Sequence, residues 1–204
     1  MDDSLTFFVT IWIKFFFLFT PFFAISMFLS LTDGTEINRR RLVLRTTGAV
    51  FVLCFILFFF GKQIFAVFGI TIDAFRVGAG ALLFLSAVGL VQAKAVLPHP
   101  DQDKDVAVVP LALPVIVGPA TAGALLVLGA ELSGASEKLI GCLALAVAIA
   151  SVGLLLFSAS FIERILRRKG ITILSKITGL VLAAMAAQLI LVGIRNFLMV
   201  GGVE

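Results

Sequence analysis

Six long apolar runs are the feature that most constrains what this chain can fold into. A helix needs about 20 apolar residues to cross the roughly 30 Å hydrocarbon core of a bilayer. The runs show no alternation of period two, which disfavours a β-barrel, and a helix satisfies its backbone hydrogen bonds internally, as lipid demands. The sequence therefore predicts an all-α membrane protein with six transmembrane helices, at residues 5–31, 46–68, 74–96, 107–130, 139–162 and 174–197.

The composition excludes a soluble enzyme. Hydrophobic residues make up 61% of the 204 residues and charged residues 14%, against roughly 45–50% and about 25% in soluble domains. A soluble core of this size could not bury so much apolar surface. The single histidine, His99, lies in a polar link with no catalytic partner in the spans. We therefore expect no enzymatic activity, no cofactor and no metal site.

The basic residues predict the orientation of the chain in the membrane. Cytoplasmic links of membrane proteins carry an excess of Lys and Arg. The first, third and fifth links hold 11 of the 16 basic residues, so we expect these links in the cytoplasm and both termini in the periplasm of a bacterial inner membrane. The clusters would face anionic lipid, and no nucleic acid is expected as a partner. The residues are Arg39, Arg40, Arg41, Arg45, Lys94, Lys104, Arg164, Arg167, Arg168, Lys169 and Lys176.

An internal repeat divides the chain into two halves. The sequence Gly-Ile-Thr-Ile at residues 69–72 recurs at residues 170–173, and Gly78 matches Gly179 at the same offset of 101. Each copy is predicted to open the third helix of its half. Because each half has three helices, the second half must enter the membrane from the opposite side. We therefore predict one integral membrane domain of two inverted three-helix repeats, residues 1–97 and 98–204, a plan typical of secondary transporters.

Proline interrupts the first helix of each half and marks the candidate site. A proline inside a helix frees backbone carbonyls and amides, which then need partners. A polar solute can supply these partners, although a plain kink is the alternative. The predicted site lies at mid-membrane, where the two interrupted helices meet. The candidate substrate-binding residues are Thr20, Pro21, Phe22, Phe23, Ala24, Gly118, Pro119, Ala120, Thr121 and Gln188.

Charged side chains are confined to the ends of the spans. No carboxylate lies near the middle of any run, which favours a neutral or zwitterionic solute matched by helix dipoles alone. Asp73 and Arg76, spaced i and i+3, are predicted to pair as an outer gate, although Asp73 is also placed to cap a helix. Lys14 and Arg195 are expected to extend toward the membrane surface.

Four stretches make this chain resemble the MarC family of bacterial inner-membrane proteins from end to end. The most specific is Pro-Leu-Ala-x-Pro followed by Gly-Pro in the second half. The resemblance implies a six-helix protein related to small neutral amino acid transporters and similar in plan to lysine exporters. The matching stretches are Thr20–Pro21 through Thr32, Phe75–Val77 through Phe84, Val109–Pro114 with Gly118–Pro119, and Gly179 through Gln188.

Two functions from different classes are consistent with these observations. The first is a secondary transporter of a small zwitterion such as glycine or alanine, which requires interrupted helices and a site between them. The second is a non-transporting membrane scaffold or regulator, which requires packed helices without a midplane cavity. The paired prolines favour the first. The sequence leaves open the substrate, the coupling ion, the direction of transport and the oligomeric state, a homo-oligomer included.

Overall fold

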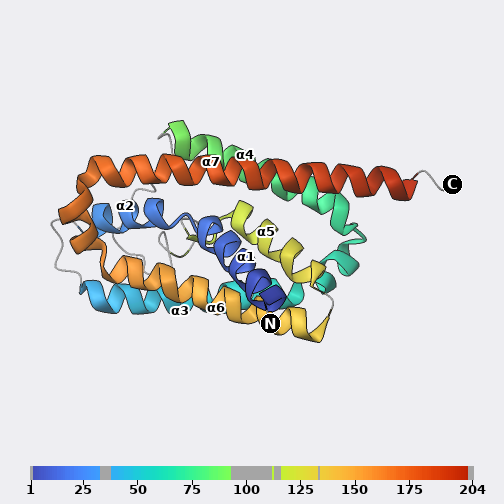
Figure 1. Cartoon of the computed structure of the whole chain (residues 1–204), viewed down its shortest axis with the longest axis horizontal. Helices are drawn as coiled ribbons and strands as arrows, with labels where there is room; N and C mark the ends of the chain where they lie inside the picture. The colour runs from blue at the N-terminus through green and yellow to red at the C-terminus, as the bar shows by residue number, and fades with distance from the viewer. Residues whose placement is uncertain (1, 33–37, 93–111, 113–115, 133, 202–204) are drawn as a thin grey trace.

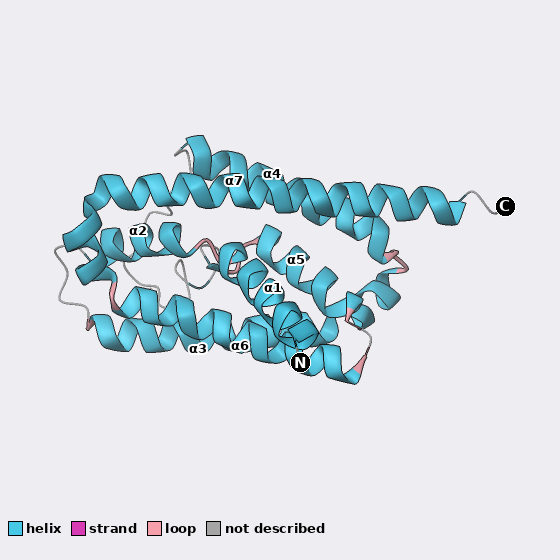
Figure 2. Cartoon of the chain, in the orientation of Figure 1, coloured by secondary structure: helices cyan, strands magenta, loops and turns pink. Residues whose placement is uncertain are grey.

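The computed structural model of the chain (Figure 1) describes residues 2–32, 38–92, 112, 116–132 and 134–201. Within these ranges the regular structure is helical throughout (Figure 2). His99, the basic residues Lys94 and Lys104, Pro114 of the matching stretch and the beginning of the span predicted at residues 107–130 lie outside the described residues. The helices are α1 (Asp2–Leu18), α2 (Pro21–Thr32), α3 (Arg39–Phe68), α4 (Ile72–Gln92), α5 (Pro119–Glu131), α6 (Ala135–Phe157) and α7 (Ala159–Gly201).

The helices confirm an all-α membrane protein. Five stretches are long and apolar enough to cross a bilayer: Ser4–Thr32, which contains most of α1 and all of α2, then α3, α4, α6 and most of α7. The sixth predicted span is represented by α5, which is apolar but only 13 residues long. About 20 residues are needed for a full crossing, so α5 by itself spans only part of the hydrocarbon core.

The interrupted helices lie between two pairs of long ones. In Figure 1, α4 and α7 run along the upper side and α3 and α6 along the lower side, with α1, α2 and α5 between them. The contacts agree with this arrangement, because α1 packs on α6, α2 on α7, and α5 on both α3 and α4. The short helices therefore form the middle layer, where long helices on both sides shield them.

Two glycines allow α3 and α5 to approach until their backbones touch. A Cβ atom added to Gly61 would lie 2.5 Å from the carbonyl oxygen of Leu126, and one added to Gly129 would lie 2.1 Å from that of Phe58. Both distances are too short for any side chain. Small residues at such contacts are typical of helix association in membranes, and here they hold the short helix α5 against a full-length span.

The repeated Gly-Ile-Thr-Ile sequence does not have the same conformation twice. Gly69 ends α3 in the left-handed region, with a φ of 63°, and its amide donates to the carbonyl of Ala66 at 3.3 Å. Gly170 instead lies inside α7, three residues after Arg167, whose φ of 55° interrupts the helix. The second copy therefore lies in the first turn of the helical segment that follows Arg167, so both copies mark the start of the third helix of their half, but the residues with positive φ, Gly69 and Arg167, are 98 positions apart rather than 101.

Candidate functional site

The first membrane-spanning stretch is interrupted at Thr20, between α1 and α2. The φ of Thr20 is 46°, a conformation that non-glycine residues rarely adopt. The Thr20 amide donates to the Phe17 carbonyl at 2.9 Å, and the helix resumes where the Ala24 amide donates to the Thr20 carbonyl at 3.0 Å. Pro21 takes the first position of α2, where a missing N–H costs no helical hydrogen bond. The interruption predicted from Thr20–Pro21 is therefore present.

The second interruption precedes α5 and also uses a proline. Gly118 caps α5 in an extended conformation, with φ −79° and ψ 173°, and Pro119 takes the first helical position. The Gly118 carbonyl accepts from the Ala122 amide at 2.8 Å. Just upstream, the Val117 amide donates to the carbonyl of Ala112 at 2.9 Å, five residues back, which is the spacing of a π-type turn. Both interruptions therefore begin a short helix with a proline.

A hydrogen bond joins the two interruptions. The Thr121 hydroxyl, in the first turn of α5, donates to the carbonyl of Leu18, the last residue of α1, at 3.3 Å. In an uninterrupted helix that carbonyl would accept from the amide four residues on, in the first turn of α2. Thr121 is buried, with 6% of its surface exposed. A side chain of one half thus satisfies a carbonyl that the interruption of the other half has freed.

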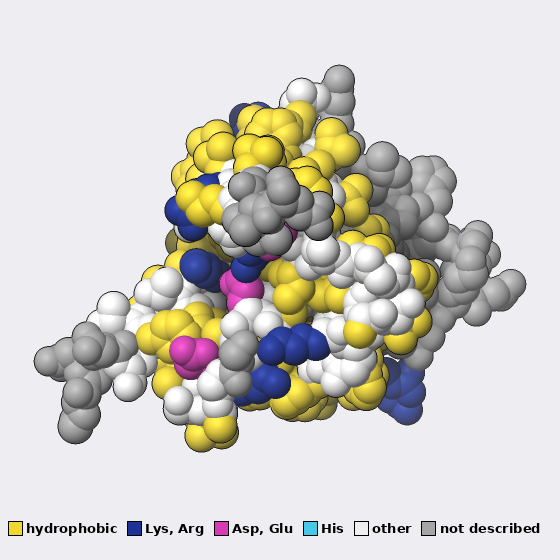
Figure 3. Space-filling view, turned by 90° about the vertical axis from the view of Figure 1, so that its right-hand side faces the viewer, with side chains coloured by type: hydrophobic (Ala, Val, Ile, Leu, Met, Phe, Trp, Pro, Cys, Tyr) yellow, Lys and Arg dark blue, Asp and Glu magenta, His cyan; other side chains and the backbone are white. Residues whose placement is uncertain are grey.

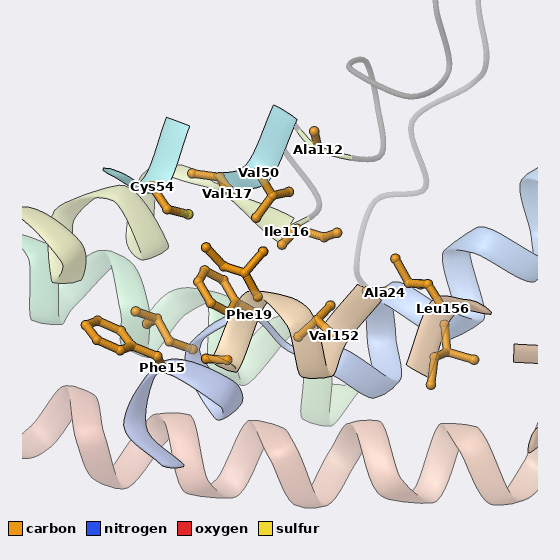
Figure 4. Packing of buried hydrophobic residues seen from close by; sticks show 14 of the residues in the cluster. Phe15, Phe19, Ala24, Val50, Cys54, Ala112, Ile116, Val117, Val152 and Leu156 are labelled. Atoms are coloured by element: carbon orange, nitrogen blue, oxygen red, sulfur yellow. The ribbon is translucent and has the colours of Figure 1, made fainter. Parts of the chain in front are cut away.

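The surroundings of both interruptions are apolar. Phe19, Ile116 and Val117 are at most 2% exposed and belong to one buried hydrophobic cluster, which Figure 4 shows from close by. Phe22 and Phe23 pack against the same cluster from the first turn of α2. The polar groups available here are therefore backbone groups and the hydroxyls of Thr20 and Thr121, among aromatic and branched side chains.

The predicted site residues fall into two places. All except Gln188 lie at the two interruptions, as the sequence predicts, whereas Gln188 is on the exposed face of α7. At the interruptions, Pro21, Ala24, Ala120 and Thr121 are buried, Thr20, Phe22, Phe23 and Gly118 are half-buried, and Pro119 is exposed.

Gln188 lines a pocket nearer the end of the molecule that carries the α5–α6 turn. The pocket has a volume of about 250 Å³, and α1, α4, α5 and α7 all contribute to it. Figure 3 looks at this end, where basic and acidic side chains gather within a largely apolar surface. Lys14, from α1, contributes to the lining here. The lining residues are Lys14, Arg76, Leu128, Glu131, Met185, Gln188, Leu189 and Val192.

An ionic contact joins two of the residues that line this pocket, Arg76 and Glu131. Arg76 pairs with Asp73 in α4, as its spacing predicts, and its Nε also donates to Glu131 Oε1 in α5 at 2.9 Å. Asn196 in α7 donates to Asp73 Oδ1 at 3.2 Å. Sequence reasoning missed Glu131 and Asn196, because their partners lie 55 and 123 positions away. The only available signal was that Glu131 is a charged residue at the end of an apolar run.

Comparisons with known proteins identify the family of the chain. The sequence model of the MarC family integral membrane proteins matches residues 5–198. The chain is 33% identical to UPF0056 membrane protein MJ1677 of Methanocaldococcus jannaschii, over 96% of this chain and 100% of that protein. It is 31% identical to UPF0056 membrane protein YhcE of Escherichia coli, over 88% and 87% of the two chains.

A third relative is UPF0056 membrane protein YvbG of Bacillus subtilis, which is 30% identical over 94% of this chain and 95% of that protein. None of these three names specifies a substrate. No solved structure matches the chain significantly. The match to the family covers nearly every described helix, and the resemblance inferred from the sequence is confirmed: the chain belongs to the MarC family of integral membrane proteins.

Proposed function

We propose that this protein is a secondary transporter, not an enzyme, for a small neutral amino acid, with its binding site between the two interrupted helices. The observation that carries this proposal is the hydrogen bond from the Thr121 hydroxyl to the Leu18 carbonyl. It brings together the two places where proline opens the backbone, and one of them belongs to each half of the chain. A pair of unrelated kinks has no reason to meet in this way.

The helix termini at the interruptions suit a zwitterion. α2 and α5 both begin near the middle of the molecule (Figure 1), and the first amides of a helix have no intrahelical acceptor and carry a partial positive charge. These amides would receive the carboxylate of the solute. The Leu18 carbonyl, which Thr121 holds in the structure described here, would accept from the ammonium group. A zwitterion is then bound without a buried counter-charge.

The transporter proposal includes two inverted repeats, residues 1–97 and 98–204. The packing supports them, because α1 packs on α6 and α5 packs on α3. This is the pattern expected if the helices of the first repeat, α1, α3 and α4, correspond in order to α5, α6 and α7 of the second. A Cβ atom on Gly80 would lie 3.0 Å from the Ala186 carbonyl oxygen, and one on Gly179 would lie 3.0 Å from that of Ala87. Both correspondences, Gly80 with Gly179 and Ala87 with Ala186, have an offset of 99.

We also propose the inner (plasma) membrane as the location, with both termini periplasmic. The 11 basic residues in the first, third and fifth links support this orientation. Reporter fusions at Glu204 and within residues 164–169 test it. A reporter at Glu204 that is active in the cytoplasm would reverse the orientation without affecting the site.

A scaffold without transport activity is the second candidate. The apolar packing of Phe19, Ile116 and Val117 around the interruptions favours it, since a transporter must admit a polar solute there. In the transporter this packing would correspond to a closed conformation. The two candidates differ in whether purified protein moves any amino acid across a bilayer.

Uptake by proteoliposomes tests the proposal. The purified protein should accumulate radiolabelled glycine or alanine above the level of empty liposomes, and Thr121→Val should lower uptake about tenfold or more through the loss of a buried polar contact. Ser151→Val is the matched control, because the Ser151 hydroxyl bonds only one turn back in its own helix. Absence of uptake for every neutral amino acid would favour the scaffold, and unchanged uptake in Thr121→Val would remove α5 from the site.

A further inference from the structure

The pocket near the α5–α6 turn contains two basic side chains with different surroundings. Lys14, one turn before the end of α1, is half-buried and lines the pocket. Within the described part of the chain it has no ion pair or hydrogen bond. Arg76 in the same pocket is satisfied by both Asp73 and Glu131. A half-buried ammonium group attracts an anion more strongly than one in bulk water, because the local dielectric constant is lower, so an anionic group that enters the pocket is favoured beside Lys14.

We propose that this pocket is a solute-binding site in which Lys14 receives a carboxylate group. The inference rests on the proposed transport function in taking the solute to be a small zwitterion, and it deepens that function by assigning a second binding position. The volume of about 250 Å³ is large beside the roughly 30 Å³ that one water molecule occupies in the liquid. A carboxylate beside Lys14 would form a charge-assisted hydrogen bond, the strongest kind available to it.

The other walls of the pocket define the class of solute. The Gln188 amide can donate to the same carboxylate, and Leu128, Met185 and Val192 offer an apolar surface to a short side chain. Glu131 attracts an ammonium group and repels a second carboxylate. The pocket therefore fits a monocarboxylate, and a zwitterionic amino acid better than a dicarboxylic acid.

The pocket lies next to the interruptions. Lys14 precedes Leu18 by four residues of α1, which is about 6 Å along the helix axis, and the Leu18 carbonyl is the group that Thr121 holds. A solute released from Lys14 would move by about one helical turn to reach the opened backbone. The pocket is thus the outer position of a two-step route, and the interruptions are the inner position.

Protection of Lys14 from chemical modification tests the inference directly. The full chain is purified in lipid nanodiscs and treated with an amine-acylating reagent, with propionate, alanine or propionamide present, and acylation is followed by mass spectrometry. At twice their Kd, propionate and alanine should slow acylation of Lys14 about threefold, as simple competition requires. Propionamide, which lacks the carboxylate, should not slow it. Lys62, exposed on α3, serves as the internal control and should react at one rate throughout.

Substitution of Lys14 supplies the second measurement. Lys14→Met should weaken propionate binding about tenfold or more, whereas Lys14→Arg, which keeps the charge, should retain most of it. Protection of Lys14 that propionate and propionamide provide equally, or unchanged affinity in Lys14→Met, overturns the inference. Protection without any amino acid uptake would contradict the transport proposal alone, and uptake without protection would contradict this inference alone.

Discussion

The interruptions and the pocket near the α5–α6 turn, called the outer pocket from here on, present polar groups of two different kinds. At the interruptions the groups belong mainly to the backbone, and side chains such as Phe19, which is fully buried, pack closely around them. In the outer pocket the groups are charged side chains, and a volume of about 250 Å³ is open beside them. The comparison teaches that this chain keeps charge where there is room for water and uses uncharged backbone dipoles where there is none. Burying a charge costs far more than burying a dipole.

Removal of a buried aromatic side chain at the interruptions should have the largest effect on stability. Phe19→Ala should lower the free energy of unfolding by about 3 kcal/mol, because the cavity forfeits the packing contacts of a fully buried ring. Thermal denaturation in detergent measures this. Phe60→Ala is the matched control: Phe60 is 53% exposed, so its loss should be much smaller. Equal losses would mean that the interruptions are not closely packed.

Loss of the ionic contacts at the outer pocket should have the second-largest effect on stability. Arg76→Gln should cost about 2 kcal/mol, because it leaves Asp73 and Glu131 without the cation between them. The Arg76 side chain is only 12% exposed, so solvent screens this loss little. A double-mutant cycle with Glu131→Gln should give a clear coupling energy.

The control for Arg76 is an exposed ion pair elsewhere in the chain. The Arg168 side chain pairs with Glu163 but is 67% exposed, and such pairs contribute roughly 0–1 kcal/mol. Arg168→Gln should therefore cost less than Arg76→Gln. Equal stability of the two variants would contradict the expectation that the ion pairs of Arg76 stabilise the fold more than an exposed ion pair does.

Substitution of Thr20 and of Gly118, the residues at the two interruptions, should have different effects on stability. Thr20 has a left-handed φ of 46°, so Thr20→Gly should raise stability by about 1 kcal/mol by relieving backbone strain. Gly118 has an extended conformation that any residue adopts, so Gly118→Ala should lose little through its backbone. Chemical denaturation of both variants tests this pair, and a large loss in Thr20→Gly would show that the threonine side chain outweighs the strain.

The smallest effect on stability is expected at Lys14. It has no ion pair or hydrogen bond in the described part of the chain, so Lys14→Met should change the free energy of unfolding by no more than about 0.5 kcal/mol. The melting temperature of the purified variant is the measurement. A loss comparable to that of Arg76→Gln would assign Lys14 a structural role and weaken the distinction between the two basic residues of the pocket.

The sequence was informative wherever a signal is local. Runs of about 20 apolar residues predicted the membrane helices because lipid leaves the backbone few alternatives. Thr20–Pro21 and Gly118–Pro119 predicted both interruptions because proline cannot donate a helical hydrogen bond. The Gly-Ile-Thr-Ile repeat marked the start of the third helix in each half, but it did not predict the backbone conformation. Gly69 ends α3 with a positive φ, whereas Gly170 is helical in the first turn after Arg167.

The contacts between distant residues were decided only by the tertiary structure. The sequence by itself determined an all-helical membrane protein with interruptions at two prolines. It did not determine that Thr121 would satisfy Leu18, that Glu131 would join Arg76, or that Lys14 would face a pocket. The physical reason is that local propensity fixes where a helix begins and ends, whereas the neighbour of a side chain depends on helix rotation and crossing. Close packing sets the rotation and crossing of the helices, for example where Gly129 contacts the backbone of Phe58.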